Sequence, residues 1–238
     1  MNLPQYINDW FINPKLKTIG FSFYAIRKSL LKAVTELKAI IGGQVLDIGC
    51  GVMPYKDYLL ESNRISKYIG IDIEPTNYHH HLKPDYYWDG KKIPLETNSV
   101  DWVIATEFLE HYFNTQAILK EIQRVLKPGG KLFFTVPCIW TLHESPNDEY
   151  RFTPYSLNKH FSLAGFKESD IKALGGFNLS LAILIGLWLE KRDLSKRGRI
   201  IFKFILTPFY KYLLKKDIIY NNFTNDQYPS GLYGYATK

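Results

Sequence analysis

The sequence predicts an α/β fold: a doubly wound, mostly parallel seven-stranded sheet with a helical insertion before the last strand. Two observations lead to this prediction. Short apolar runs such as Val45–Ile48 and Val100–Ala105 alternate with segments of helical period at intervals typical of βαβ units. The first run leads into Gly49 and Gly51, and then into Pro54, which suits the first turn of a helix. A strand, a glycine turn and a helix start form the crevice in which such sheets bind nucleotide-like ligands.

The predicted elements follow one another closely from residue 22 to residue 174. Residues 1–20 carry prolines and aromatic residues without a clear period, so we expect them to be irregular. The segment Pro128-Gly129-Gly130 is expected to end a helix and precede a strand. We predict helices at 22–41, 55–60, 115–126 and 153–165, and strands at 45–48, 68–73, 86–88, 100–105, 131–136 and within 168–174.

We expect residues 1–238 to form one domain. Its parts are an N-terminal extension and helix (1–43), a ligand-binding core (44–176), an insertion (177–226) and a last strand (227–238). The insertion combines a nearly apolar stretch, Phe177–Leu189, with a stretch that mixes Lys and Arg with Ile, Phe, Leu and Tyr. This composition suits a peripheral helix on an anionic membrane, a lid over an apolar acceptor, or a homodimer contact through 177–216.

Charge and cysteine content limit the partners and the compartment. The formal net charge is +7 and the isoelectric point is near 9.1, which favours an acidic partner such as nucleic acid, anionic lipid or a phosphorylated substrate. Two cysteines give neither a disulfide framework nor zinc spacing, and the N-terminus lacks the pattern of a signal peptide. We therefore expect a cytoplasmic protein, with peripheral membrane contact as an option.

Four segments resemble, in order and at the usual spacing, the signature motifs of class I S-adenosylmethionine-dependent methyltransferases of the methyltransferase-11-like, small-molecule or glycan type. They are Val45–Gly51, Gly70–Ile73, Phe108–His111 and Val125–Leu132. One G-x-G is weak evidence, whereas four ordered motifs are strong. The resemblance covers roughly 44–175 and implies a Rossmann-like fold with S-adenosyl-L-methionine as cofactor. A nicotinamide site would require a third glycine at position 54.

The resemblance implies cofactor contacts for nine residues. The glycine turn lets the methionine portion lie against bare backbone, and an acid on the first strand faces the ammonium group. An acid ending the second strand accepts hydrogen bonds from the ribose hydroxyls. An Asp-Gly pair holds the adenine amino group, and a carboxylate after the fourth strand lies near the methyl group. The turn residues are Gly49, Cys50 and Gly51, the acid on the first strand is Asp47, and Asp72 with Ile73 ends the second strand. The Asp-Gly pair is Asp89 and Gly90, and the carboxylate after the fourth strand is Glu107.

Two features of this interpretation stay open at the level of sequence. The third glycine position of the family is Met53 here, and we expect the bulkier turn to shift the methionine tail or to narrow the pocket. Asp72 also has a plain alternative, a solvated strand end.

His111 and His143 are the candidate catalytic residues, because histidine titrates near neutral pH and both follow strands that border the crevice. Each has an alternative role in positioning or in structure. The polar loop after the fifth strand is the candidate acceptor site, and a capped, solvated loop is its alternative. The substrate candidates in this loop are Glu144, Asp148, Tyr150 and Arg151. A similar His…Asp-x-x-Arg-x-Thr pattern occurs in methyltransferases near bacterial polysaccharide and cell-envelope genes.

No metal site is predicted. The run His79-His80-His81 has no carboxylate or cysteine at ligand spacing and is expected to be a surface loop. Cys138 follows the fifth strand, as a nucleophilic cysteine does in one class of RNA methyltransferases, but the companion motifs are missing and we expect an inert thiol.

The sequence thus predicts methyl transfer to a small-molecule, glycan or lipid-linked acceptor at oxygen. An RNA methyltransferase is the second interpretation, motivated by the positive charge, and nucleic acid ranks below the other acceptors. The Asp/Asn-Pro-Pro-aromatic signature of amino-directed nucleic-acid enzymes is missing, because the fourth strand continues Ala105-Thr106-Glu107-Phe108. A non-catalytic, cofactor-binding partner subunit is the third interpretation.

Overall fold

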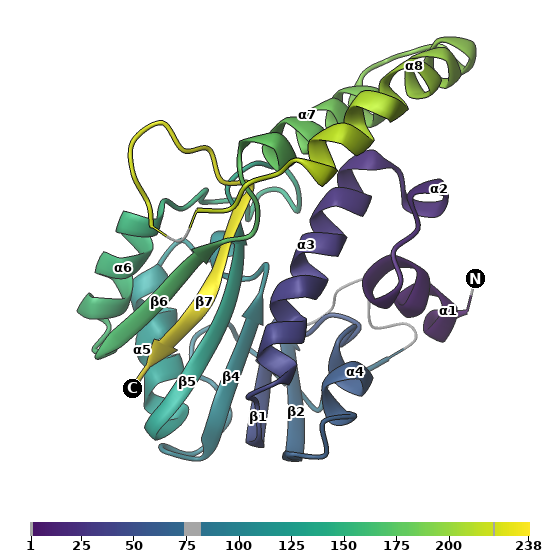
Figure 1. The fold of residues 1–238 in the computed structure, drawn as a ribbon. Helices are drawn as coiled ribbons and strands as arrows, with labels where there is room; N and C mark the ends of the chain where they lie inside the picture. Colours follow the sequence, from purple (N-terminus) through teal and green to yellow (C-terminus); the bar gives the residue numbers. More distant parts are fainter. Residues whose placement is uncertain (1, 74–81, 221) are drawn as a thin grey trace.

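A seven-stranded sheet runs through the centre of the molecule (Figure 1). The computed structural model describes residues 2–73, 82–220 and 222–238. The strands are β1 (Gly43–Ile48), β2 (Ile65–Ile73), β3 (Tyr86–Trp88), β4 (Val100–Thr106), β5 (Leu126–Pro137), β6 (Glu168–Ala173) and β7 (Gly231–Thr237). Their order is β3-β2-β1-β4-β5-β7-β6. β7 is antiparallel to β5 and β6, and the other neighbouring pairs are parallel. The predicted fold class is confirmed.

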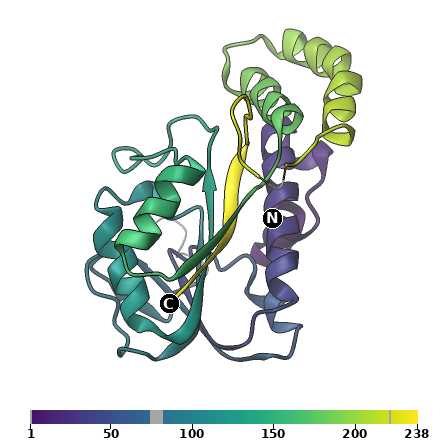
Figure 2. The same ribbon diagram turned by 60° about the vertical axis from the view of Figure 1, so that its left-hand side comes forward.

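Helices cover both faces of this sheet, as the second view shows (Figure 2). One apolar core packs α3 and α7 against β1, and the other packs α5 and α6 against the opposite face. Leu46 and Ile48 face one core and Val45 the other, which explains the apolar run in β1. The helical segments are α1 (Leu3–Ile7), η1 (Asn8–Ile12), α2 (Leu16–Ile19), α3 (Phe21–Lys38), α4 (Lys56–Leu60), η3 (Leu109–His111), α5 (Thr115–Val125), α6 (Pro154–Leu163), α7 (Phe177–Lys191) and α8 (Lys196–Lys215).

The expectation that residues 1–20 are irregular is wrong. The segment forms α1, a π-helical turn and α2 in close succession. The side chain of Asn2 caps α1, and Trp10 packs edge-on against Phe23 of α3 at a centroid distance of 5.4 Å. These short turns depend on aromatic packing against α3, and such packing leaves no periodic stripe in the sequence.

β5 begins earlier than predicted. α5 ends at Val125, yet the chain stays extended through Pro128-Gly129-Gly130, and Leu126 already pairs with Val100 of β4. The tripeptide therefore prevents continuation of the helix and still belongs to the strand, with a register irregularity between Val100 and Trp102.

The insertion is a helical hairpin, α7–α8, which we call the arm (177–216). α7 buries Ala182 and Ile183 in the core beside α3. The C-terminal half of α8 is held at Tyr210, whose ring stacks on Phe21 at 4.1 Å and whose hydroxyl donates a 2.7 Å hydrogen bond to the Phe21 carbonyl. The other end of the arm projects away from the sheet (Figures 1 and 2).

The topology places the crevice at one edge of the sheet. β1 lies between β2 and β4, because β2 and β3 are added on one side of β1 and β4 and β5 on the other. In open α/β sheets, ligands bind beyond the carboxyl ends of the strands at such a topological switch point. β6 runs parallel to β5, because both are antiparallel to β7. α7 therefore starts at the same edge at which β1, β2 and β4 end.

Candidate active site

The glycine turn after β1 combines close packing with open space. Gly49 and Gly51 have φ angles of 66° and 49°, and the N–H groups of Gly49 and Cys50 donate to the Ile71 carbonyl at 2.9 and 3.1 Å. A Cβ on Gly49 would lie 2.4 Å from the Phe108 ring, whereas a Cβ on Gly51 would meet no atom of the described residues within 4 Å. Gly49 is thus required for packing, and Gly51 borders room for a ligand.

Met53 does not narrow the turn beside Gly51. Its φ of 47° is the left-handed conformation that a glycine adopts easily, and its side chain is buried. The Met53 sulfur lies 2.7 Å from the place where a Cβ on Gly70 would be. The glycine on β2 therefore provides the space for Met53 under the turn, and the expected narrowing is not found at Gly51.

Asp72 ends β2 directly beside the glycine turn. One of its carboxylate oxygens accepts a 2.9 Å hydrogen bond from the Gly51 N–H, and the other accepts one of 2.8 Å from the N–H of Ile73. The side chain is buried, so the alternative of a solvated strand end does not apply. The structure thus brings together Asp72, Ile73 and the turn, as predicted.

Asp47 lies on β1 and is also buried. Its carboxylate accepts a 2.6 Å hydrogen bond from the Tyr68 hydroxyl of β2. Burial raises the pKa of Asp47 to about 7, the Tyr68 hydrogen bond opposes this rise, and the nearby charge of Asp72 adds to it. A cation bound next to Asp47 would favour its ionised form, which suits the predicted contact with an ammonium group.

The raised pKa of Asp47 predicts a pH dependence of stability. Between its ordinary value of 3.8 and about 7 the folded state binds more protons than the unfolded chain, so the free energy of unfolding falls as the pH rises through this window. Asp47→Asn cannot ionise. We expect its stability relative to wild type to rise by about 4 kcal/mol between pH 4 and pH 8, because the pKa of Asp47 is raised from 3.8 to about 7 and one pKa unit corresponds to about 1.4 kcal/mol. Denaturant unfolding at both pH values measures this, with exposed Asp193→Asn as control; a difference independent of pH contradicts the assignment.

Asp89 and Gly90 lie just beyond β3. Asp89 is exposed and accepts hydrogen bonds from the N–H groups of Lys91 and Lys92, which lower its pKa. Tyr112 donates a hydrogen bond to the Gly90 carbonyl, and its ring stacks on Trp88 at a centroid distance of 6.2 Å. Two stacked aromatic rings thus support the Asp89-Gly90 turn, where the adenine contact is predicted.

Glu107 follows β4 and is fixed to β5. Its φ is 50°, its N–H donates to the Thr135 hydroxyl at 3.0 Å, and that hydroxyl donates to the Glu107 carboxylate at 2.9 Å. Burial raises the pKa of Glu107, while the Thr135 hydrogen bond and the charge of Arg27 on α3 oppose the rise. The carboxylate is therefore held in place at the end of β4 by Thr135 of β5.

The two predicted catalytic histidines, His111 and His143, are in contact. The rings of His111 and His143 lie 4.8 Å apart in an edge-to-face arrangement. His111 Nδ1 lies 2.7 Å from the Asn147 carbonyl oxygen, so this nitrogen carries the proton and donates it. Burial lowers the pKa of His143, although the charge of Asp148 opposes this. His143 is thus neutral near pH 7 and able to accept a proton.

The loop after β5 brings some of the predicted substrate residues together. Arg151 donates to both oxygens of Asp148 at 2.7 and 2.9 Å, which holds the pKa of Asp148 well below its usual range. Asp148 also accepts a 3.1 Å hydrogen bond from the His143 N–H. Glu144 is exposed with a φ of 52°, and Tyr150 turns aside, because its hydroxyl donates to the Phe113 carbonyl at 2.7 Å.

Sequence reasoning missed Glu110, Tyr112 and Arg27. Glu110 is fully buried beside His111, and its pKa is raised well above its usual value by burial and by the charge of Glu107. The Glu-His pair directly after β4 was the available signal. No sequence pattern marks Arg27, which reaches the site only because α3 packs over it.

Two further sequence features are Cys138 and the run of three histidines at 79–81. Cys138 lies 3.5 Å from the Phe152 carbonyl, and burial, with the charge of Glu107, raises its pKa to about 12, so the thiol is inert as expected. The run His79-His80-His81 lies outside the described residues.

The residues at this edge fit S-adenosylmethionine. Gly51 borders open space, the Asp72 carboxylate lies at the end of β2, and the exposed side chain of Ile73 is next to Gly90, whose Cβ would lie 4.0 Å from it. These features would receive the methionine backbone, the ribose and the adenine in that order.

Comparison with known proteins agrees with this geometry. A family model described as a methyltransferase domain matches residues 46–134. The tRNA (carboxymethyluridine(34)-5-O)-methyltransferase of Schizosaccharomyces pombe is 28% identical over 57% of this chain and 63% of its own length. The ubiquinone biosynthesis O-methyltransferase of Idiomarina loihiensis is 33% identical over 40% of this chain and 43% of its own length. The chain thus spans less than two thirds of these relatives.

Solved structures share the fold. A SAM-dependent methyltransferase from Archaeoglobus fulgidus aligns over 100% of both chains at a TM-score of 0.57 and 17% identity. Phosphoethanolamine N-methyltransferase 2 of Haemonchus contortus, solved with S-adenosyl-L-methionine, aligns over 87% of this chain and 52% of its own at a TM-score of 0.52 and 18% identity. With its ordered motifs and these matches, the chain contains an S-adenosylmethionine-dependent methyltransferase domain, matched by the family model over residues 46–134, and its sheet has the fold of the solved class I enzymes.

Proposed function

We propose that this protein transfers a methyl group from S-adenosylmethionine to an oxygen of a lipid-linked or glycan acceptor at a membrane surface. One observation carries the proposal: an exposed apolar and cationic arm leaves the sheet at the same edge as the cofactor crevice. Small soluble acceptors fit the crevice equally but give the arm no role.

The chain's own residues have limited chemistry to perform, because the bound cofactor supplies an already activated methyl group. Asp72 and the glycine turn hold and orient the cofactor, and Thr135 holds Glu107 in place at the end of β4. Correct alignment of the acceptor oxygen then supplies much of the rate. His143, neutral near pH 7, and His111 stand where they can take the proton of the acceptor hydroxyl.

The names of several relatives are consistent with an oxygen or lipid acceptor. The relative from Idiomarina loihiensis is an O-methyltransferase of ubiquinone biosynthesis. A demethylmenaquinone methyltransferase of Staphylococcus saprophyticus is 25% identical over 63% of this chain and 80% of its own length. These names support the acceptor class without identifying the acceptor.

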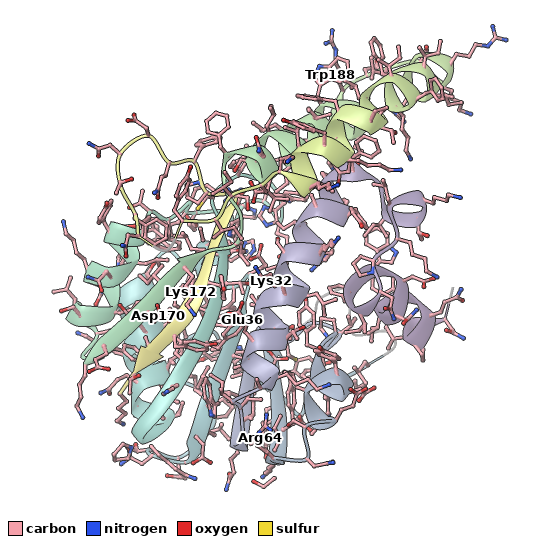
Figure 3. The ribbon with its side chains drawn as sticks, in the orientation of Figure 1. Lys32, Glu36, Arg64, Asp170, Lys172 and Trp188 are labelled. Atoms are coloured by element: carbon pink, nitrogen blue, oxygen red, sulfur yellow. The ribbon has the colours of Figure 1, made fainter. Side chains whose placement is uncertain are left out.

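The free half of the arm has the composition of an interfacial helix. α8 contains six Lys or Arg residues and no acidic residue. Large apolar side chains on the same helix are open to solvent, with Phe204 82% exposed and Ile200 69% exposed. Figure 3 shows side chains extending from the arm around Trp188, which packs on Phe202 at 5.2 Å. None of the described helices is long and apolar enough to cross a bilayer.

An anionic lipid surface fits this arm better than a second copy of the chain does. A symmetric contact between two arms would bring cations against cations, which is unfavourable. Anionic headgroups instead complement the Lys and Arg side chains, while the exposed Phe and Ile side chains enter the acyl boundary. Because α7 starts at the edge of the crevice, a membrane-bound arm brings the acceptor site close to the lipid surface.

The arm gives a measurable prediction. We expect the full chain to float with vesicles of phosphatidylglycerol and phosphatidylcholine and to stay in solution with pure phosphatidylcholine. Phe204→Ser should weaken vesicle binding by about tenfold, since one large apolar side chain contributes about 1.5–3 kcal/mol on burial. Leu163→Ser on α6, 71% exposed and far from the arm, is the matched control. Equal binding to neutral vesicles, or a stable dimer by light scattering that Phe204→Ser abolishes, would refute the proposal.

The activity itself is tested by transfer of tritiated methyl groups into fractionated extract. The proposal expects label in the lipid-extractable or glycan fraction, at a position stable to mild base as an ether is. Label in RNA would instead support the second candidate, which the net charge of +7 and the tRNA-modifying relative favour. Retained RNA with a steep salt dependence would accompany that outcome. Cofactor binding without transfer to any fraction would support the third candidate, a partner subunit.

A further inference from the structure

Glu110 carries a buried carboxylate beside His111 and His143. Its side chain is fully buried, and neither of its oxygens has a hydrogen-bond partner among the described residues. Burying a polar group without a partner costs roughly 1–3 kcal/mol, and an ionised one costs more. Such a group calls for a positively charged or proton-donating partner.

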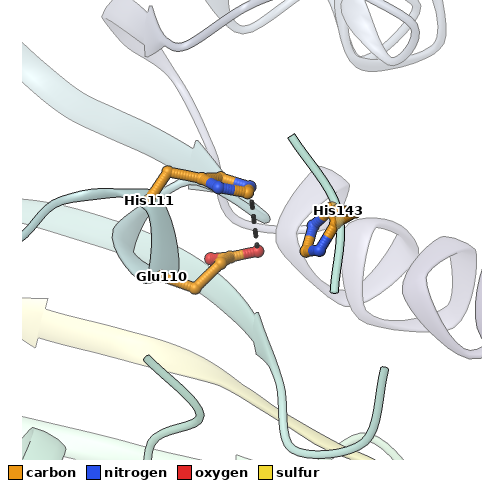
Figure 4. A group of neighbouring side chains, drawn as sticks. All are labelled: Glu110, His111 and His143. Carbon is orange, nitrogen blue, oxygen red and sulfur yellow. Dashed lines mark ion pairs between the residues drawn. The ribbon is translucent and has the colours of Figure 1, made fainter. Parts of the chain in front are cut away.

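His111, whose contact with Glu110 is drawn as a dashed line in Figure 4, does not donate a hydrogen bond to the carboxylate. His111 Nε2 lies 3.8 Å from Glu110 Oε1, beyond a hydrogen bond. The other ring nitrogen, Nδ1, lies 2.7 Å from the Asn147 carbonyl oxygen and must donate to it. In neutral His111 the lone pair of Nε2 therefore faces the carboxylate. A ligating histidine typically has this arrangement, with its far nitrogen donating to a carbonyl.

A second histidine completes the group. One ligand atom each from Glu110, His111 and His143 lie within 4.8 Å of one another (Figure 4). His143 Nδ1 is buried and has no hydrogen-bond partner among the described residues, although Asp148 Oδ2 is 3.4 Å away. The three side chains come from η3 and from the loop after β5.

Arg151, the cation whose charge acts on Glu110, is already committed. It donates to both oxygens of Asp148 and to the carbonyl oxygens of Tyr150 and Thr141. Its charge is therefore largely balanced by Asp148. Three donor atoms converge with no cation among the described side chains bonded to them, and two of the three side chains offer nitrogen.

We propose that Glu110, His111 and His143 bind a divalent first-row transition-metal ion. Two imidazole nitrogens suit zinc, iron and nickel, whereas magnesium and calcium prefer oxygen ligands throughout. Such ions lie about 2.0–2.2 Å from each ligand, which places ligand atoms roughly 3–4 Å apart, so small side-chain rotations close the site. With three protein ligands, a position stays open for an exogenous oxygen ligand.

The metal site would take part in the proposed methyl transfer by activating the acceptor hydroxyl, and this role alone rests on the proposed function. An acceptor hydroxyl in the open position loses its proton more readily, because the ion stabilises the oxygen anion. The O–H bond breaks and the proton passes to solvent. The oxygen then forms a bond to the methyl carbon as the carbon–sulfur bond breaks and the sulfonium becomes a thioether. The two histidines then hold the ion instead of taking the proton.

Metal binding is tested without cofactor or acceptor. Chelator-treated full-length protein is titrated with Co²⁺ and followed by visible absorption, and with Zn²⁺ by calorimetry. We expect one ion per chain and the absorption bands of a site with nitrogen ligands. Loss of an outer-shell partner alone costs 10–100-fold in affinity, so Glu110→Gln and His143→Gln should weaken binding by at least about 100-fold.

The control variants replace one glutamate and one histidine that lie outside the proposed metal site. Glu149→Gln on the same loop, with its exposed side chain, and His160→Gln on α6, which keeps a group able to bond Gln116, should bind the ion as wild type does. Circular dichroism and calorimetry with S-adenosylmethionine establish that each variant is folded. Wild-type protein that binds the cofactor but neither metal refutes the inference and leaves the proposed function standing. Equal metal loss in the control variants also refutes it.

Discussion

Asp72→Ala is expected to reduce S-adenosylmethionine affinity by at least about 100-fold. A carboxylate that accepts two hydroxyl hydrogen bonds contributes roughly 1.5–3 kcal/mol for each, and 1.4 kcal/mol corresponds to a factor of ten. The substitution also removes the acceptor of the Gly51 N–H, which is 2.9 Å from Asp72 Oδ2, so the turn loses a support at the same time. Isothermal titration calorimetry with the cofactor and with its homocysteine product measures the loss.

Asp89→Ala is the comparison for this experiment. Asp89 is exposed and makes local hydrogen bonds to Lys91 and Lys92, so its removal should cost about tenfold or less. Unchanged affinity in Asp72→Ala would remove the ribose assignment. If neither wild type nor variant bound the cofactor, the proposed activity would fail as well.

The two glycines of the turn are expected to respond in opposite ways. At Gly49, an alanine Cβ would lie 2.4 Å from the Phe108 ring, and φ is 66°. Strain in the left-handed region costs roughly 1–2 kcal/mol, and overpacking adds roughly 1–3 kcal/mol. We therefore expect Gly49→Ala to lower the free energy of unfolding by about 2–5 kcal/mol, measured by denaturant unfolding.

At Gly51 we expect an alanine to weaken cofactor binding more than it destabilises the fold. Among the residues that the structure describes, no atom lies within 4 Å of a Cβ there, so the expected cost to the fold is the strain of a φ of 49°, about 1 kcal/mol. The same Cβ would occupy the space assigned to the cofactor, and Gly51→Ala should bind it more than about tenfold more weakly. Normal cofactor affinity in this variant would show that the open space serves another purpose.

Much of the fold was predictable, because local pattern and burial agree in the central strands. β1, β2 and β4 are apolar runs bounded by turn residues, and they are found within a few residues of their predicted limits. The exceptions have a common cause. The helical turns of residues 3–19 and the early start of β5 depend on partners distant in sequence, such as Phe23 and Val100.

In the candidate site too, the residues on local motifs were predictable from the sequence, and those that depend on distant contacts were not. Residues that motifs place at strand ends, such as Asp72 and Glu107, lie where expected. Glu110 was overlooked because an acid after a strand reads as an exposed residue, and only the folded loop 138–153 shows that it is buried. Tyr150 stays a predicted substrate residue, and only the structure shows that its hydroxyl donates to the Phe113 carbonyl.

The sequence by itself determined the fold class, the glycine turn and the identity of the cofactor, since each depends on short segments whose spacing along the chain is fixed. Only the tertiary structure decided how Met53 fits, through the missing side chain of Gly70. It also decided that Glu110, His111 and His143 converge and that the arm leaves the edge of the crevice. These are contacts between segments far apart in sequence, and they form only when the strands take their order in the sheet.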